Sequence, residues 1–187
     1  MPQEDSIAMA EDAAFHREQT QVAAGMAAAA LIAIAAIGVA LWRGDGPAEP
    51  AAERLAIALR LDLFVIAWLL AAIGNVARLR FFSAQDIAGS ATTVASDAVR
   101  RGNAILQNTL EQAALAVTVH LGLAATLPHP APLLLTLVIL FGLGRLLFWL
   151  GYARGAAGRA FGFALTFYPT AFSLIVGLAV VLTGRAA

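Results

Sequence analysis

Long apolar runs constrain this chain more than any other feature of its sequence. Residues 21–42 contain no charged side chain, and this run has about the length that crosses the hydrocarbon core of a bilayer. Of the 187 residues, 60% are hydrophobic and 13% are charged, whereas soluble domains contain roughly 45–50% and about 25%. Because lipid cannot satisfy backbone polar groups, such runs are expected to be helical. The sequence therefore predicts an all-α integral membrane protein.

Five membrane spans are expected, because apolar runs alternate with polar or turn-rich connectors. The first span is 21–42, and the polar segment 1–20 is expected to be solvated or interfacial, since a secretory signal would begin with positive charge. Pro128 and Pro130 stop the third run, and Pro132 suits the first turn of the fourth. The other spans cover about 55–78, 97–127, 132–152 and 159–182, with an interfacial loop at 81–96 and a tight loop at 153–158.

All the basic residues are arginines, and their distribution indicates the orientation of the five spans. Seven fall in the amino terminus, the connection 78–101 and the loop 153–159, whereas four fall on the opposite side. The positive-inside rule therefore places the amino terminus in the cytoplasm and the carboxyl terminus on the opposite side. The first group is Arg17, Arg78, Arg80, Arg100, Arg101, Arg154 and Arg159, and the second is Arg43, Arg54, Arg60 and Arg185.

Charge and cysteine content exclude several functions. The formal net charge is zero, which gives no electrostatic reason to expect nucleic acid as a partner. Cysteine is absent, so any thiol chemistry must use the thiol of a substrate. The histidines, His16, His120 and His129, are too scattered to indicate a metal site, and His120 is expected to pack between helices.

A polar cluster at 107–112 interrupts the third apolar run. Lipid offers a carboxylate or an amide no hydrogen-bond partner, so such residues usually face a bundle interior or a water-filled cavity. On a helix, Arg101, Asn108 and Glu111 share one face, and Gln107 lies beside it. We expect the function of the chain to depend on this cluster.

Arg145 is a second intramembrane charge, well inside the fourth run. At helical spacing it begins a stripe that continues through Phe148, Trp149 and Tyr152. If this stripe faces the third run, Arg145 and Glu111 would form an ion pair. Two interpretations stay open: the pair is a structural clamp that neutralises two buried charges, or the two residues belong to a binding site.

Arg154, Arg159 and Tyr152 also have two interpretations. Arginines and tyrosines at the membrane surface commonly anchor a protein among lipid headgroups. Alternatively, the arginines form a cationic pocket for an anionic ligand, in which an arginine near a bound thiol favours the thiolate and activates it. Asp62 is expected to form an interfacial pair with Arg60.

Two motifs resemble a known family. The third run carries Asn108-Thr109-Leu110-Glu111, and the fourth leads from Arg145 through Gly151-Tyr152-Ala153-Arg154 to Arg159. This combination resembles the MAPEG superfamily, the membrane-associated proteins of eicosanoid and glutathione metabolism. The segment from Gly151 to Arg159 is similar to leukotriene C4 synthases, and the family also includes microsomal glutathione transferases. The resemblance covers about residues 57–183.

The resemblance implies a four-helix membrane domain at 55–183, to which the helix 21–42 is an addition. It further implies a homotrimer that binds glutathione between neighbouring subunits near the cytoplasmic surface. Arg159 would stabilise the glutathione thiolate, which would attack a lipophilic electrophile or reduce a lipid hydroperoxide arriving from the bilayer. The implied glutathione-binding residues are Arg78, Arg101, Gln107, Asn108, Glu111, Arg145, Tyr152 and Arg154.

Four positions depart from the family pattern. Ala104 stands where relatives often have an arginine, for which Arg101 is a possible substitute; Phe148 and Phe163 replace polar aromatic residues, and Gln112 replaces an aromatic one. Two functions follow. One is a glutathione-dependent transferase or peroxidase of the bacterial inner membrane. The other is a non-catalytic protein of the same fold, either an accessory subunit of a larger membrane complex or a lipid-binding module. A small transporter is a third hypothesis, but no inverted repeat is visible.

Overall fold

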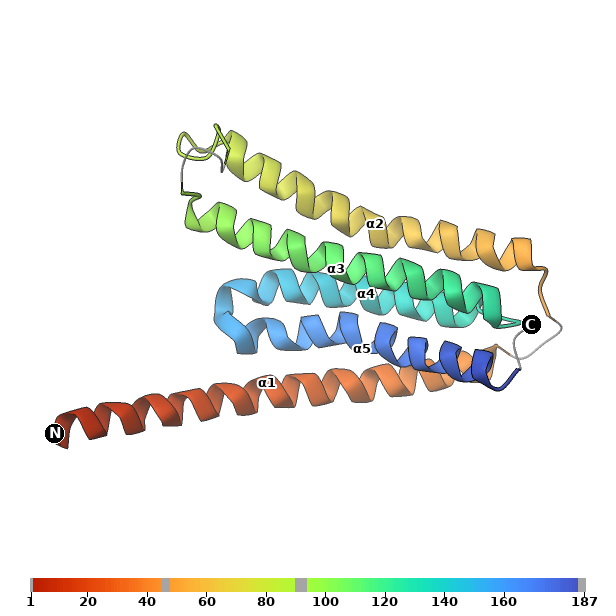
Figure 1. Cartoon of the computed structure of the whole chain (residues 1–187), viewed down its shortest axis with the longest axis horizontal. Helices are drawn as coiled ribbons and strands as arrows, with labels where there is room; N and C mark the ends of the chain where they lie inside the picture. The colour runs from red at the N-terminus through yellow and green to blue at the C-terminus, as the bar shows by residue number, and fades with distance from the viewer. Residues whose placement is uncertain (1, 45–47, 90–93, 185–187) are drawn as a thin grey trace.

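The computed structural model describes residues 2–44, 48–89 and 94–184. In these ranges the chain is helical, as predicted, and Figure 1 shows the helices running side by side. The helices are α1 (Pro2–Arg43), α2 (Ala51–Phe81), α3 (Asp97–Thr126), α4 (Ala131–Gly151) and α5 (Gly155–Leu182), with the 3₁₀ turn η1 (Tyr152–Arg154) between α4 and α5.

Three helical stretches are long and apolar enough to cross a membrane. They are Glu11–Arg43, Ala51–Phe81 and Ala131–Leu182, the last of which contains both α4 and α5. α3 is not among them, because even its more apolar part contains Glu111, Gln112 and His120. Length and composition of the three stretches are those of an integral membrane protein.

The helix that contains the predicted span 21–42 is longer than that span. α1 begins at Pro2, because the polar segment is rich in Ala, Glu and Gln, which favour helix, and simply extends the apolar helix. Figure 1 shows this end of α1 projecting beyond the other helices. The predicted loop 153–158 is wrong, because η1 and the first residues of α5 occupy this segment. Gly155 has a φ of +80°, a conformation that glycine adopts without strain, so the chain reverses at once and α5 starts there.

Small residues dock α1 onto α5 and α4. Ala29 and Ala33 are fully buried, one helical turn apart, and Gly25 continues the same face. A Cβ atom at Gly25 would lie only 3.4 Å from the backbone nitrogen of Phe161 on α5. Such small-residue faces let helix backbones approach closely in membranes. The position of α1 along the bundle is therefore fixed by this contact.

Glycines bring α4 and α5 even closer together. A Cβ atom at Gly162 would lie 2.2 Å from the backbone nitrogen of Phe148, and one at Gly151 would lie 1.9 Å from the carbonyl oxygen of Gly158. Both positions accept only glycine without displacing a backbone. This contact sets the register between the end of α4, which carries Arg145, and the beginning of α5, which carries Arg159.

The contact between α2 and α3 contains a buried polar pair. Asp62 was expected to pair with Arg60, but its Oδ1 atom lies 2.5 Å from Nδ1 of His120. Arg60 is exposed, because it lies two residues before Asp62 and so points to another side of the helix. His120 does pack between helices, as expected, and both members of the pair are buried.

A carboxylate also organises the connection from α2 to α3. Asp86 accepts hydrogen bonds from the Ser83 hydroxyl at 2.6 Å and from the Ser96 amide at 2.8 Å. Ser96 in turn caps α3 by accepting from the amide of Val99. The predicted start of the third helix near Asp97 is confirmed.

Candidate functional site: a cationic pocket at one end of the bundle

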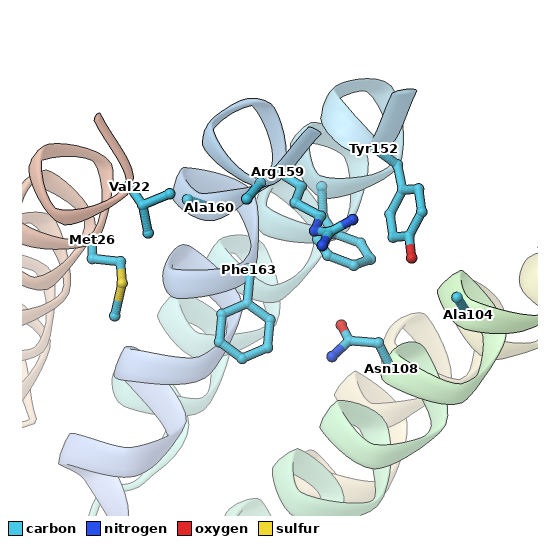
Figure 2. A pocket seen from close by; sticks show the side chains of 10 residues that line it. Val22, Met26, Ala104, Asn108, Tyr152, Arg159, Ala160 and Phe163 are labelled. Carbon is cyan, nitrogen blue, oxygen red and sulfur yellow. The ribbon is translucent and has the colours of Figure 1, made fainter. Parts of the chain in front are cut away.

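A pocket of about 360 Å³ opens among α1, α3, α4 and α5. This volume lies within the range of small-molecule sites, roughly 300–1,000 Å³. Figure 2 shows the side chains around it, with those of α1 on one side and those of α3 and η1 on the other. The pocket is lined by Val22, Met26, Ala104, Asn108, Phe148, Tyr152, Ala156, Arg159, Ala160 and Phe163.

Arg145 lies behind this pocket and orients Asn108. The Arg145 side chain is buried, and its Nη1 donates to Oδ1 of Asn108 at 2.8 Å while its Nε donates to Oγ1 of Thr166 at 3.1 Å. Arginine has only donors, so the oxygen of the Asn108 amide must face it. The NH₂ group of Asn108, a residue that lines the pocket, consequently remains as a donor. Arg145 therefore fixes the orientation of the Asn108 amide, so that its NH₂ group is the hydrogen-bond donor left for a ligand.

The predicted pair of Arg145 with Glu111 is wrong. Glu111 is exposed, and its Oε1 accepts from Nε2 of Gln107 at 2.9 Å. Three residues along an α-helix turn a side chain about 60° away from the starting direction. Asn108 therefore meets Arg145, and Glu111 points out of the bundle. This geometry excludes the interpretation that Arg145 and Glu111 form a structural ion pair.

Arg159 covers the ring of Tyr152. Its guanidinium carbon lies 4.7 Å from the ring centroid, a distance at which a cation and an aromatic face attract. The Tyr152 ring packs edge-on against Phe148, with centroids 5.4 Å apart, and Phe148 also lies against the Arg145 guanidinium at 4.6 Å. Aromatic rings thus hold both guanidinium groups at the pocket without neutralising them.

The described residues do not balance the positive charge of the site. Among the ion pairs of the residues that the structure describes, neither Arg145 nor Arg159 has a carboxylate partner. Nη2 of Arg145 is buried, and it has no hydrogen-bond partner among the residues that the structure describes. A buried cation without a counter-charge is costly, and a bound anion would lower that cost. The arrangement is suited to an anionic ligand with acceptor groups.

The other predicted site residues lie outside this pocket. Arg78 and Arg101 line a second hollow of about 230 Å³ between α2 and α3, where Nη2 of Arg78 donates to Oδ1 of Asn75 at 3.1 Å. Gln107 and Glu111 are exposed on α3, and Arg154 is exposed in η1. Thus Asn108, Tyr152 and Arg159 converge with Arg145 behind them, and the remaining residues lie elsewhere on the molecule.

Sequence reasoning missed the contribution of α1. Val22 and Met26 line the pocket although they lie in a helix that was regarded only as an addition to the four-helix domain. Their spacing of four residues places them on one face, which is the only sequence signal for this role. Figure 2 shows both side chains pointing from α1 towards the cavity. No group of three His, Asp or Glu side chains in the described ranges is placed to hold a metal ion.

Fold and site together define a helical membrane protein with a cationic pocket at one end of its bundle. The sequence model of the MAPEG family matches residues 55–179, which is well over half of the chain. The chain belongs to the MAPEG family, and the resemblance inferred from its motifs is confirmed. Comparisons with curated proteins and with solved structures find no significant match. α1, which supplies Val22 and Met26 to the pocket, lies outside the matched region.

Proposed function

We propose that this protein is a glutathione-dependent membrane transferase or peroxidase that acts on lipophilic electrophiles or lipid hydroperoxides. The observation that carries the proposal is the pair of uncompensated guanidinium groups, Arg145 and Arg159, beside the fixed amide donor of Asn108. Glutathione is an anionic peptide whose carboxylates and carbonyls need such donors. Membership of a family named for glutathione metabolism supports the same ligand.

The proposed roles follow from the chemistry of each side chain. Asn108 donates to a carbonyl or carboxylate of the peptide, and the Tyr152 hydroxyl provides a second polar contact at the pocket wall. Arg159 is the proposed catalytic residue, because a guanidinium beside the bound thiol favours the thiolate, which is the nucleophilic form. The aromatic face of Tyr152 keeps Arg159 in place during this step.

The thiolate then has two possible reactions. With an electrophile, its sulfur forms a bond to carbon while the leaving group or a π bond accepts the electron pair. With a hydroperoxide, sulfur attacks the terminal oxygen, the O–O bond breaks, and the alkoxide takes a proton to give an alcohol. The resulting sulfenic acid reacts with a second glutathione, releasing water and the disulfide. Neither reaction requires a cysteine from the chain, which has none.

We further propose that five spans assemble into a homotrimer in which a neighbouring subunit completes the site. Gln107 and Glu111 are exposed on α3, where contact with lipid would be costly, and a protein interface would cover them. The hollow with Arg78 and Arg101 supplies additional cations that a single chain leaves away from the main pocket. The proposed location is the bacterial inner membrane, with membrane lipids around the trimer, the amino terminus in the cytoplasm and the carboxyl terminus opposite.

One observation favours a second candidate, a non-catalytic protein of the same fold. Ala104, Phe148 and Phe163 all line the pocket, so three of the four departures from the family pattern remove polar groups from this one site. Such a pocket suits a lipid-binding module. In the same reading, the projecting end of α1 would attach the protein to a larger membrane complex as an accessory subunit.

Replacement of Arg159 tests the enzyme hypothesis. In Arg159→Ala, glutathione-dependent turnover of a model electrophile and of an alkyl hydroperoxide should fall by about 10²–10³-fold, the usual cost of losing one preorganised charge-stabilising donor. Arg43→Ala is the matched control, because it removes an exposed arginine from the last turn of α1, away from the pocket, and should leave turnover within a factor of about two. Equal turnover in both variants would refute the role of Arg159.

A further inference from the structure

α1 supplies part of the pocket although it lies outside the family domain. Val22 and Met26 are half-buried, and they lie four residues apart on the face that α1 turns towards α5. The same face carries the small residues Gly25, Ala29 and Ala33 that dock the helix. The side chains that reach the pocket are therefore fixed by the same contact that fixes α1.

The docking contact ends where the pocket begins. Residues 11–21 of α1 are exposed, so Val22 is the first side chain after residue 10 to enter the packed bundle. Met26 packs next to the core cluster formed by Ala29, Ala164, Leu140 and Leu165. α1 thus closes one side of the pocket with two apolar side chains of unequal size.

The two sides of the pocket differ in polarity. One side presents Asn108, Arg159 and the hydroxyl of Tyr152, whereas the α1 side presents only carbon and a thioether. Ala156, Ala160 and Phe163 of α5 extend the apolar side. Figure 2 shows Val22 and Met26 opposite Asn108, with Phe163 between them. A ligand with one charged and one apolar part matches this division better than glutathione alone does.

We propose that Val22 and Met26 form the wall that receives the apolar part of the lipophilic co-substrate and limits its length. This assignment rests on the proposed glutathione-dependent function, because the charged side of the pocket is then occupied by glutathione. Methionine is unbranched and polarizable, so Met26 adapts to apolar groups of different shape while still closing the far end of the pocket. Val22 is stiffer and sets a fixed boundary.

S-alkyl glutathiones test the assignment, because each joins the charged and the apolar part in one soluble molecule. Binding of glutathione and of its S-methyl, S-hexyl and S-decyl derivatives is measured by calorimetry on the full chain in lipid nanodiscs. Each buried methylene gives roughly a fourfold gain in water, so S-hexylglutathione should bind at least about tenfold tighter than the S-methyl compound. Met26→Trp, which fills the far end of the pocket, should abolish this gain and leave the S-methyl affinity within about twofold.

Two further variants distinguish a specific effect of Met26→Trp from general unfolding of the protein. Leu31→Trp introduces the same bulk on the same helix at a side chain that is 70% exposed, and it should behave as wild type. Met26→Ala enlarges the pocket and should shift the preference from S-hexyl towards S-decyl glutathione. A Met26→Trp protein that still binds the S-methyl compound is folded by that criterion.

The outcomes separate the wall from the proposed function. Binding of S-methylglutathione without any dependence on chain length, or an equal loss in Met26→Trp and Leu31→Trp, overturns the wall and keeps the glutathione site. Binding of S-decylglutathione that depends on Met26, in a protein that binds neither glutathione nor the S-methyl compound, keeps the wall and overturns the glutathione function. Failure of every compound to bind overturns both.

Discussion

Two buried polar clusters, in different parts of the bundle, use charge in opposite ways. Arg145 contacts Asn108 and Thr166 at the pocket, and its charge has no carboxylate partner among the described residues. Asp62 and His120 face each other between α2 and α3, so an acid meets a base inside the protein. Asn108 and His120 are twelve residues apart, which is about 18 Å along α3.

The surroundings of the clusters explain this difference. The Asp62–His120 pair lies next to the core cluster that includes Ala58, Val119 and Leu123, and the pair does not line a described pocket. The Arg145 cluster borders a pocket of about 360 Å³ and fixes the orientation of the Asn108 amide at its wall. Within the described residues, Oδ2 of Asp62 and Nε2 of His120 lack hydrogen-bond partners, as Nη2 of Arg145 does, so the difference lies in charge and access. The acid and the base of the Asp62–His120 pair belong to the architecture of the bundle, whereas the Arg145 cation borders a pocket and has no acid beside it.

The largest expected effect comes from breaking the Asp62–His120 pair. His120→Leu leaves the Asp62 carboxylate buried without its partner, so the free energy of unfolding should fall by about 3–5 kcal/mol. The double variant Asp62→Leu/His120→Leu replaces both polar groups with apolar ones and should recover most of this loss. Thermal and denaturant unfolding in detergent measure both variants. Equal destabilisation in the single and double variants would show that the two side chains are not energetically coupled.

The next largest effect is expected at Arg145, where a substitution should weaken ligand binding rather than stability, in contrast to the Asp62–His120 pair. Arg145→Met removes the cation and releases the Asn108 amide, so glutathione binding should weaken by about 1.5–3 kcal/mol, or roughly ten- to a hundredfold. Unfolding should change by only about 1 kcal/mol or less, since no carboxylate loses its partner. Calorimetry and unfolding are compared on one preparation. A large loss of stability with unchanged binding would make Arg145 a structural residue like His120.

The smallest effect concerns a third cluster, in the connection outside the membrane-spanning helices. The Ser83 hydroxyl, followed by the Ser96 amide, lowers the pKa of Asp86 below its usual value. Because the folded pKa is lower than the unfolded one, this stabilisation is fully present above pH values of about 4 and is lost as the pH falls through the folded pKa. Asp86→Asn should remove this acid dependence.

Hydrogen exchange of the Ser96 amide as a function of pH measures the effect of Asp86. Wild type should lose protection of this amide in acid, whereas the variant should show weak protection at every pH. Protection that is identical in the two proteins would contradict the assignment. Glutathione binding should be the same in both, since Asp86 does not line the main pocket.

The sequence predicted the helices well where a local signal marks their ends. Ser96 and Asp97 provide a cap, and the prolines after α3 forbid its continuation, so both ends of that helix were expected within one or two residues. The amino end of α1 was missed because polar residues with high helix propensity carry no stop signal. Gly155 was seen as part of a loop, although its positive φ makes the reversal abrupt.

The composition of the site was harder to predict than the helices. Asn108, Tyr152 and Arg159 were expected to act together, and they line one pocket. The choice of partner for Arg145 depended on a rotation of about 60° between Asn108 and Glu111, which spacing alone does not resolve. Asp62 contacts His120, which lies 58 residues farther along the chain. This contact depends on how the helices pack and not on proximity in the sequence.

Glutathione binding to the purified, unmodified protein tests the central claim most directly. Titration calorimetry in lipid nanodiscs, supported by a thermal shift with glutathione, requires no knowledge of the second substrate. The uncompensated cationic pocket predicts saturable binding and a rise in melting temperature with ligand concentration, because a ligand that binds only the folded state stabilises it. No heat and no shift up to several millimolar glutathione, in protein that unfolds cooperatively, would contradict the account and favour the non-catalytic alternative.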